Sequence, residues 1–138
     1  ELFDFRVNDD IPVSDIKEKL QNSAFPEMEI LSVEVAVGKL TTKRAVWRIE
    51  LDTTLTSDEI KNAFDGEMPV VKRSKSGDKI VDISPMTSFV SCETVGDSIN
   101  LRVELNAAGN DYLNPSYVVA FFGDKVSVKR VVRENIVF

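Results

Sequence analysis

The side chains that most often carry covalent or metal chemistry are scarce in this sequence. Its 138 residues contain no histidine and one cysteine, Cys92. The usual general base near neutral pH, the usual zinc ligand and the Ser-His and Cys-His nucleophile pairs are therefore missing. A lone cysteine forms no internal disulfide and completes no zinc or iron–sulfur site. The sequence predicts no metal and no cofactor held by this chain, and its single thiol suits a reducing cytoplasm.

The carboxylates do not form a recognisable acid–base pair either. Asp9 and Asp10 lie in a predicted turn. Asp58 and Glu59 open a predicted helix, where negative charge is favourable. No pattern holds two of these groups, or Asp82, in a desolvated cleft that would shift a pKa. We therefore predict that the chain is not an enzyme on its own.

The densest group of positive charges is carried by a predicted hairpin. It consists of Lys72, Arg73, Lys75 and Lys79. Such a group can contact an acidic partner protein or a phosphate backbone. The alternative is a charged edge hairpin whose lysines keep it unpaired and soluble. These four residues are the leading candidate site of the sequence.

A weaker basic set lies near the end of the chain and includes Lys129 and Arg133. Strand alternation places these two side chains on one face. The net charge of −6 argues against a general nucleic-acid binder, because phosphate binding depends on lysine and arginine. No apolar run approaches the roughly 20 residues that cross a bilayer, so no membrane association is predicted. The sequence leaves the oligomeric state open.

The elements that position these groups follow from hydrophobic periodicity over the first 83 residues. Alternation predicts strands at 3–7, 30–37 and 44–52. Ser14 and Thr56 are the predicted caps of two helices. The basic hairpin, with Gly77 available for a positive φ, completes the order strand, helix, strand, strand, helix, strand. This order predicts a ferredoxin-like β-α-β-β-α-β unit, with both helices on one face of a sheet.

The rest of the chain shows a different order of predicted elements. It predicts a second hairpin over 86–105, a short helix opened by Asn114 and Pro115, and a final strand over 126–137. The predicted class is therefore α+β, with a ferredoxin-like unit at 1–83 and a hairpin, helix and strand at 84–138. The seam between them is too short for a linker, so we expect one compact domain.

A ferredoxin-like unit raises the question of RNA binding, because the best-known RNA module of this kind stacks bases on exposed sheet aromatics. Trp47 shares its predicted face with Ala45, Ile49 and Leu51, which indicates a core position. Phe3 and Phe5 also lie on the apolar side of their predicted strand. The polar sheet face therefore has no predicted stacking platform.

Several segments, taken in order, resemble the uncharacterised bacterial domain of the radical SAM-linked proteins, which are fused to or encoded beside radical S-adenosylmethionine enzymes. The resemblance covers nearly the whole chain, although each motif is weak alone. Its segments are Glu1-Leu2-Phe3-Asp4-Phe5-Arg6-Val7, Leu20-Gln21-Asn22, 26–31, Lys79-Ile80-Val81-Asp82-Ile83, Leu113-Asn114-Pro115 and Val131-Val132-Arg133.

The resemblance implies a non-catalytic accessory domain that docks on a radical S-adenosylmethionine protein or positions its substrate. The iron–sulfur cluster and S-adenosylmethionine would belong to that partner. It also implies that this is the C-terminal portion of a longer domain, whose preceding segment is rich in polar and basic residues. Two alternatives stay open: an RNA-interacting module in tRNA or ribosome modification, and an active site shared with the preceding segment, to which Asp82 or Arg133 contributes.

Overall fold

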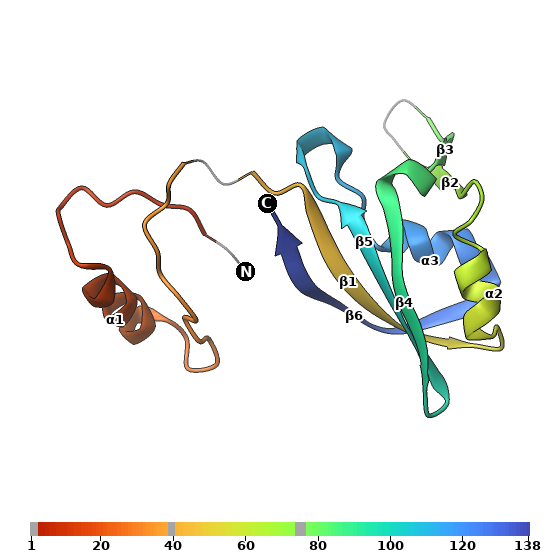
Figure 1. Ribbon diagram of the computed structural model, residues 1–138, viewed down its shortest axis with the longest axis horizontal. Helices are drawn as coiled ribbons and strands as arrows, with labels where there is room; N and C mark the ends of the chain where they lie inside the picture. Colours follow the sequence, from red (N-terminus) through yellow and green to blue (C-terminus); the bar gives the residue numbers. More distant parts are fainter. Residues whose placement is uncertain (1–2, 39–40, 74–76) are drawn as a thin grey trace. The chain divides into compact units, whose positions relative to one another are not determined.

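The computed structural model describes residues 3–38, 41–73 and 77–138 and shows a mixed α+β chain with antiparallel sheets and three α-helices (Figure 1). The chain divides into two compact units, Glu1–Leu40 and Thr41–Phe138. We refer to them as the first unit and the second unit. Among the described residues, no helix has the length and apolar character needed to cross a membrane.

The first unit is built around one helix, α1 (Val13–Ser23). The Gln21 side chain joins the end of this helix to the segment that follows it. Its Nε2 donates to the carbonyl of Met28 at 2.9 Å, and its Oε1 accepts from the amide of Ile30 at 2.7 Å. Lys17 Nζ donates to the carbonyl of Leu31 at 2.8 Å. Side-chain hydrogen bonds, rather than a buried core, therefore connect α1 with residues 28–31, since the helix has no buried residue.

Three predictions for the first unit are wrong. Residues 3–7 and 30–37 form no strand, and α1 begins after Pro12 without a side-chain cap. Alternation assigns side chains to two faces, but a strand also needs a partner for its backbone groups, and the described residues of this unit supply none. Phe3 is 72% exposed and Leu31 is 78% exposed, so the alternation buries little apolar surface here. Ser14 Oγ donates to Asp15 Oδ1 instead of capping the helix.

The second unit contains a four-stranded antiparallel sheet with the strand order β4-β5-β1-β6. β1 lies between β5 and β6, so Ile49 is opposite Leu101 on one side and Val131 on the other. Its strands are β1 (Arg44–Thr53), β4 (Thr87–Val95), β5 (Ser98–Asn106) and β6 (Val126–Val137). A separate two-stranded sheet consists of β2 (Pro69–Lys72) and β3 (Lys79–Asp82).

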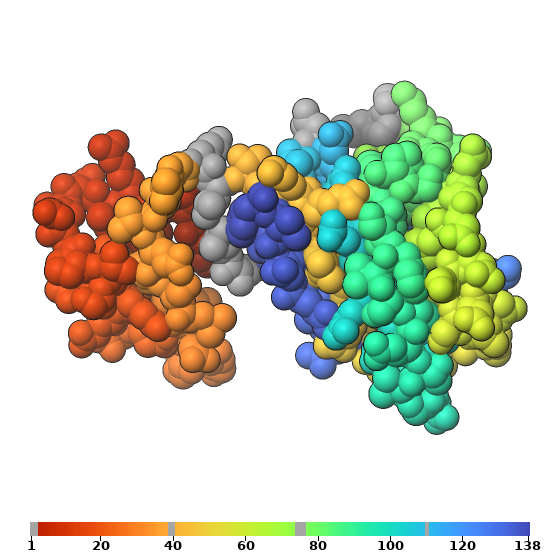
Figure 2. Space-filling view, viewed as in Figure 1, coloured from red at the N-terminus to blue at the C-terminus, as the bar shows by residue number. Residues whose placement is uncertain are grey.

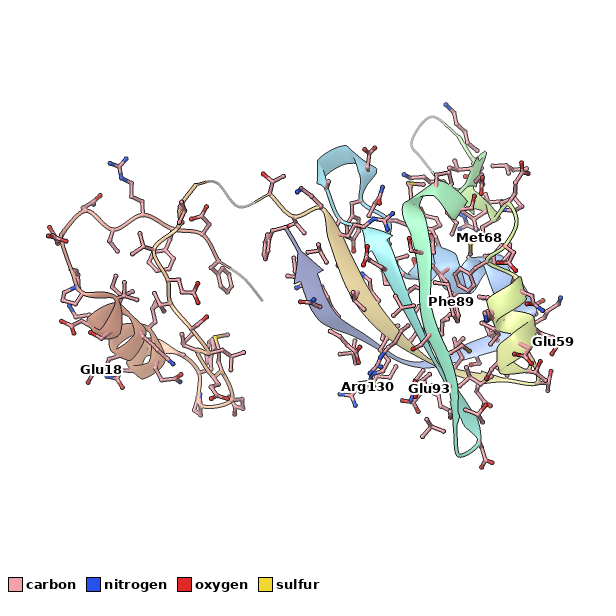
Figure 3. The ribbon with its side chains drawn as sticks, viewed as in Figure 1. Glu18, Glu59, Met68, Phe89, Glu93 and Arg130 are labelled. Atoms are coloured by element: carbon pink, nitrogen blue, oxygen red, sulfur yellow. The ribbon has the colours of Figure 1, made fainter. Side chains whose placement is uncertain are left out.

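One face of the four-stranded sheet is covered by α2 (Ser57–Asn62) and α3 (Ser116–Phe122). Ile60 of α2 and Val118 of α3 are completely buried and belong to one core with Leu101. Phe89 points from β4 toward α2, where its ring centroid lies 5.4 Å from that of Phe64 (Figure 3). Short 3-10 helices lie at Ser84–Met86, Gly109–Asp111 and Gly123–Lys125.

The local signals of the second unit predicted its elements well. Thr56 caps α2 in a complete capping box with Glu59, as expected. Gly77 has a φ of 112° in the predicted hairpin turn. Asn114 Oδ1 accepts from the amide of Ser116 at the start of α3, at 2.9 Å. Trp47 is half-buried and packs against the core.

The arrangement of these elements differs from the predicted one. The order strand, helix, strand, strand, helix, strand occurs as β1, α2, β4, β5, α3 and β6, with the β2–β3 hairpin inserted before β4. This order and the observed sheet are compatible with the ferredoxin-like pattern, but they occupy residues 44–137 instead of 1–83. β1, from the predicted unit 1–83, pairs with β5 and β6, from 84–138. The two predicted units therefore share one sheet.

Candidate functional site

The β2–β3 hairpin is fixed at its base by Asp82. Its Oδ1 accepts from the amides of Met68 at 2.8 Å and Ser84 at 2.9 Å, and its Oδ2 accepts from Ser84 Oγ at 2.8 Å. The amide of Ile83 also donates to the carbonyl of Met68 at 3.0 Å. Met68 and Ile83 are each 1% exposed, so this hydrogen-bonded base is anchored in the core (Figure 3). Asp82 thus positions the hairpin.

These hydrogen bonds also explain the acidity of Asp82. Bonds from the Ser84 amide, then from the Met68 amide and the Ser84 hydroxyl, stabilise the charged carboxylate and lower the pKa of Asp82 below its usual 3.8. A general base near neutral pH needs the opposite shift. The hydrogen-bond arrangement therefore gives Asp82 a structural role in the second unit.

The two faces of the hairpin have different surroundings. Val70 points into the core and is 5% exposed. On the other face, Val71 lies directly opposite Ile80, and these side chains are 54% and 78% exposed. We call Val71 and Ile80 the outer pair. An exposed aliphatic pair on a fixed hairpin is a surface that a partner can cover.

The predicted basic residues follow the outer pair along the hairpin, and alternation directs Lys72 and Lys79 to the face that carries Val70. Lys72 is directly opposite Lys79, and Arg73 follows β2; all three are exposed. Like charges opposite each other on a hairpin repel, which destabilises it. Within the described residues, neither lysine forms an ion pair. Lys75, the fourth predicted residue, lies outside the described residues.

The weaker predicted residues, Lys129 and Arg133, are not gathered with the hairpin residues. Lys129 Nζ donates to Ser98 Oγ at 2.7 Å, and the Arg133 guanidinium lies 5.7 Å from the centroid of Trp47. A bulge between the pairs Glu50–Arg130 and Leu51–Val128 makes Lys129 an extra residue of β6. The regular alternation that placed Lys129 and Arg133 on one face is interrupted there, so their side chains reach opposite faces of the sheet.

The sheet face opposite the helices carries an ion network that the sequence did not indicate. Glu134 Oε1 accepts from Arg48 Nε at 2.7 Å and from Arg102 Nη2 at 3.5 Å, and Glu134 Oε2 forms an ion pair with Arg102 Nε at 3.0 Å. Arg44 Nη1 is 3.0 Å from Glu104 Oε1. The arginines lie on β1 and β5, and the glutamates lie on β5 and β6. The ion pairs can therefore be recognised only once the order of the strands in the sheet is known.

The network compensates part of the arginine charge within the chain, because its three arginines pair with two glutamates. Hydrogen bonding to Arg48, followed by interactions with Arg102, lowers the pKa of Glu134 despite its partial desolvation. Glu134 therefore stays ionised and neutralises charge that a phosphate backbone would otherwise meet. The hairpin lysines differ from these arginines because they keep no such partner among the described residues.

β4 and α2 lie side by side on the face of the second unit that Figure 2 shows. Cys92 is half-buried on β4. Burial raises the pKa of its thiol, and the neighbouring Glu93 adds to that rise. A reactive cysteine needs a lowered pKa, so this thiol is not activated. Across the described residues, no three cysteine or carboxylate side chains gather as a metal site.

The fold and the hairpin define an α+β domain with an antiparallel sheet and an exposed basic projection. A family described as an uncharacterized protein conserved in bacteria (DUF2344) matches residues 1–115. The chain belongs to this family, whose description states neither an activity nor a partner. No curated protein and no solved structure matches the chain.

Proposed function

We propose that this chain is a non-catalytic accessory domain that docks on a radical S-adenosylmethionine enzyme, or positions that enzyme's substrate, through the β2–β3 hairpin. In this proposal, residues 41–138 are a ferredoxin-like unit into which the hairpin is inserted as the contact. The cluster and S-adenosylmethionine belong to the partner, and the single thiol favours a cytoplasmic location.

The observation that carries the docking role is that the hairpin has a fixed base and an exposed outer surface. Asp82 and the buried Met68 fix its base, so little conformational entropy is lost when the hairpin binds. The outer pair offers apolar surface, and Lys72 and Lys79 add positive charge that has no ion-pair partner among the described residues. Apolar surface with charge beside it is the usual composition of a protein-binding patch.

The proposed radical S-adenosylmethionine partner rests on the resemblance of the ordered segments. The structure gives several of these segments definite structural roles. Gln21, from the segment 20–22, holds the carbonyl of Met28 and the amide of Ile30, which lie in the segment 26–31. Asp82, from the segment 79–83, fixes the hairpin base.

Affinity capture from bacterial lysate tests the proposed partner. The longest available form of the protein is used as bait, with and without nuclease, and both bound proteins and bound RNA are identified. Recovery of a radical S-adenosylmethionine protein that resists nuclease is the expected result. Recovery of RNA, with every protein partner lost after nuclease, would instead place the chain among RNA-binding modules.

An RNA-interacting module in tRNA or ribosome modification is the second candidate, and Lys72, Arg73 and Lys79 favour it because they are exposed cations at the end of a hairpin. Arg48 and Arg102 on the sheet face share the carboxylate of Glu134, which reduces the positive charge offered there and weighs against it. RNA affinity that falls steeply with rising salt concentration would favour this candidate.

A further inference from the structure

The β2–β3 hairpin has an unpaired strand edge. β2 contacts both β3 and α3, whereas β3 makes its extensive contacts within the described residues with β2 alone. A two-stranded sheet is marginal by itself, and its outer edge presents backbone groups that can pair with another chain. The base of this hairpin is fixed by Asp82, so the edge of β3 is held in position.

The outer pair defines what an added strand would place on this face. Val71 and Ile80 are adjacent across the two strands, and Ile80 is the more exposed of the two at 78%. An added strand on the β3 side would lie beside Ile80. Successive side chains of a strand point to opposite faces, so every second residue of the added segment would cover this apolar surface.

The positive charges of the hairpin indicate which charged side chains an added segment would carry. Lys72 and Lys79 lie directly opposite each other, and Arg73 is next in the chain. Their repulsion is relieved when a carboxylate lies between or beside them. The chain as a whole has a net charge of −6, so this local positive group stands out against a negative surface. Charge complementarity therefore selects an acidic segment over a basic one.

We propose that β3 accepts an extended acidic segment of a partner protein as a third strand of the hairpin sheet. Alternate apolar side chains of that segment cover the outer pair, and its carboxylates, on the other face of the added strand, approach Lys79 and, across β3, Lys72. Main-chain hydrogen bonds supply affinity in this binding mode, and the alternating side chains supply specificity. The inference rests on the proposed docking function and specifies the partner's binding element.

The two edge strands of the four-stranded sheet, β4 and β6, are weaker acceptors. Both are interrupted by bulges, β4 against β5 and β6 against β1. Bulges discourage strand pairing. β3 pairs with β2 in unbroken register over all four of its residues and carries Ile80 of the outer pair.

The probe is a short fluorescent peptide that alternates Glu and Val, with Pro at both ends against self-association. Matched peptides replace Glu by Gln or by Lys, and a fourth carries N-methyl groups that block one strand edge. An oligouridine of similar charge is the RNA probe. Anisotropy titrations are expected to show binding of the Glu-Val peptide that weakens by about tenfold or more with Gln, Lys or N-methylation.

Variants of the protein locate the binding surface. Ile80→Ser and Lys79→Glu should each weaken binding of the Glu-Val peptide by about tenfold. Leu31→Ser is the matched apolar control, because Leu31 and Ile80 are both 78% exposed. Lys61→Glu, at an exposed lysine of α2, is the charge control. Both controls should bind as the unchanged protein does.

Amide hydrogen exchange separates strand addition from a purely electrostatic contact. Peptide binding should increase protection of backbone amides in β3 and leave those in β6 unchanged. Equal binding to the hairpin variants and controls, tighter binding of oligouridine, or peptide binding without new protection in β3 would each overturn the inference. Nuclease-resistant capture of a radical S-adenosylmethionine protein that is indifferent to Ile80→Ser would leave the accessory role standing and refute docking through the outer pair.

Discussion

The two units carry the same kind of sequence pattern and form different structures from it. Residues 3–7 and 30–37 alternate apolar and polar side chains as regularly as β1 does, but only β1 becomes a strand. β1 has β5 on one side and β6 on the other, and its face is covered by helices. The comparison teaches that alternation fixes which side chains share a face, while pairing and coverage decide whether a strand forms.

Matched leucine truncations give the largest expected contrast between the units. Leu101 is completely buried in β5, whereas Leu31 is 78% exposed. Leu101→Ala should lower the free energy of unfolding by about 2–5 kcal/mol, because it leaves a cavity in the core. Leu31→Ala should change it by less than about 0.5 kcal/mol. Urea denaturation followed by circular dichroism measures both, and equal losses would refute the assignment of the core.

Helix capping gives a second, smaller contrast. Thr56 Oγ1 accepts from the amide of Glu59 in α2, but no side chain caps α1. Thr56→Ala should therefore destabilise the second unit by about 1 kcal/mol, and Ser14→Ala should have no measurable effect. Thermal unfolding of the two variants checks this. A comparable loss from Ser14→Ala would mean that Ser14 caps α1 in solution.

Asp82 should make the stability of the second unit depend on pH in the acidic range. Hydrogen bonds lower the pKa of Asp82 in the folded state below the usual 3.8. Its contribution is therefore complete above the unfolded pKa and is lost as the pH falls through the folded pKa. Asp82→Asn should flatten the stability profile in this acidic window. Denaturation at a series of pH values tests it, and an unchanged slope in the variant would contradict the account.

The smallest expected effect is local to the first unit. Gln21→Ala removes the hydrogen bonds to the Met28 carbonyl and the Ile30 amide. Protection of the Ile30 amide should fall, while amides of β1 keep theirs, as amide exchange measured by NMR will show. Gln21→Glu is the matched control, because it keeps an acceptor for Ile30 and loses only the donor. Loss of protection across β1 would mean that the units are more strongly coupled than their separate contacts indicate.

Sequence reasoning succeeded where the determinant is local. The capping box of Thr56 and Glu59 gave α2, and the Gly77 turn gave the hairpin that presents Lys72 and Lys79. It failed where the determinant is a distant partner. No residue near position 30 indicates that this alternating segment has no partner strand.

The same limit applies to the candidate site. The cations of the hairpin could be found from composition, but the direct opposition of Lys72 and Lys79 depends on the hairpin register. The exposure of Ile80 depends on which hairpin face meets the core. The pairs that Glu134 forms with Arg48 and Arg102 depend on the strand order, and the position of Lys129 depends on a bulge.

The most direct test of the central claim is to compare capture by the protein and by its Lys72→Glu/Lys79→Glu variant after nuclease treatment. Lys19→Glu/Lys61→Glu is the control, because it makes the same change in net charge at two exposed lysines elsewhere. The account predicts that the hairpin variant recovers the radical S-adenosylmethionine protein at least about tenfold less well, while the control recovers it normally. Equal recovery by the protein and both variants would contradict a docking role for the hairpin.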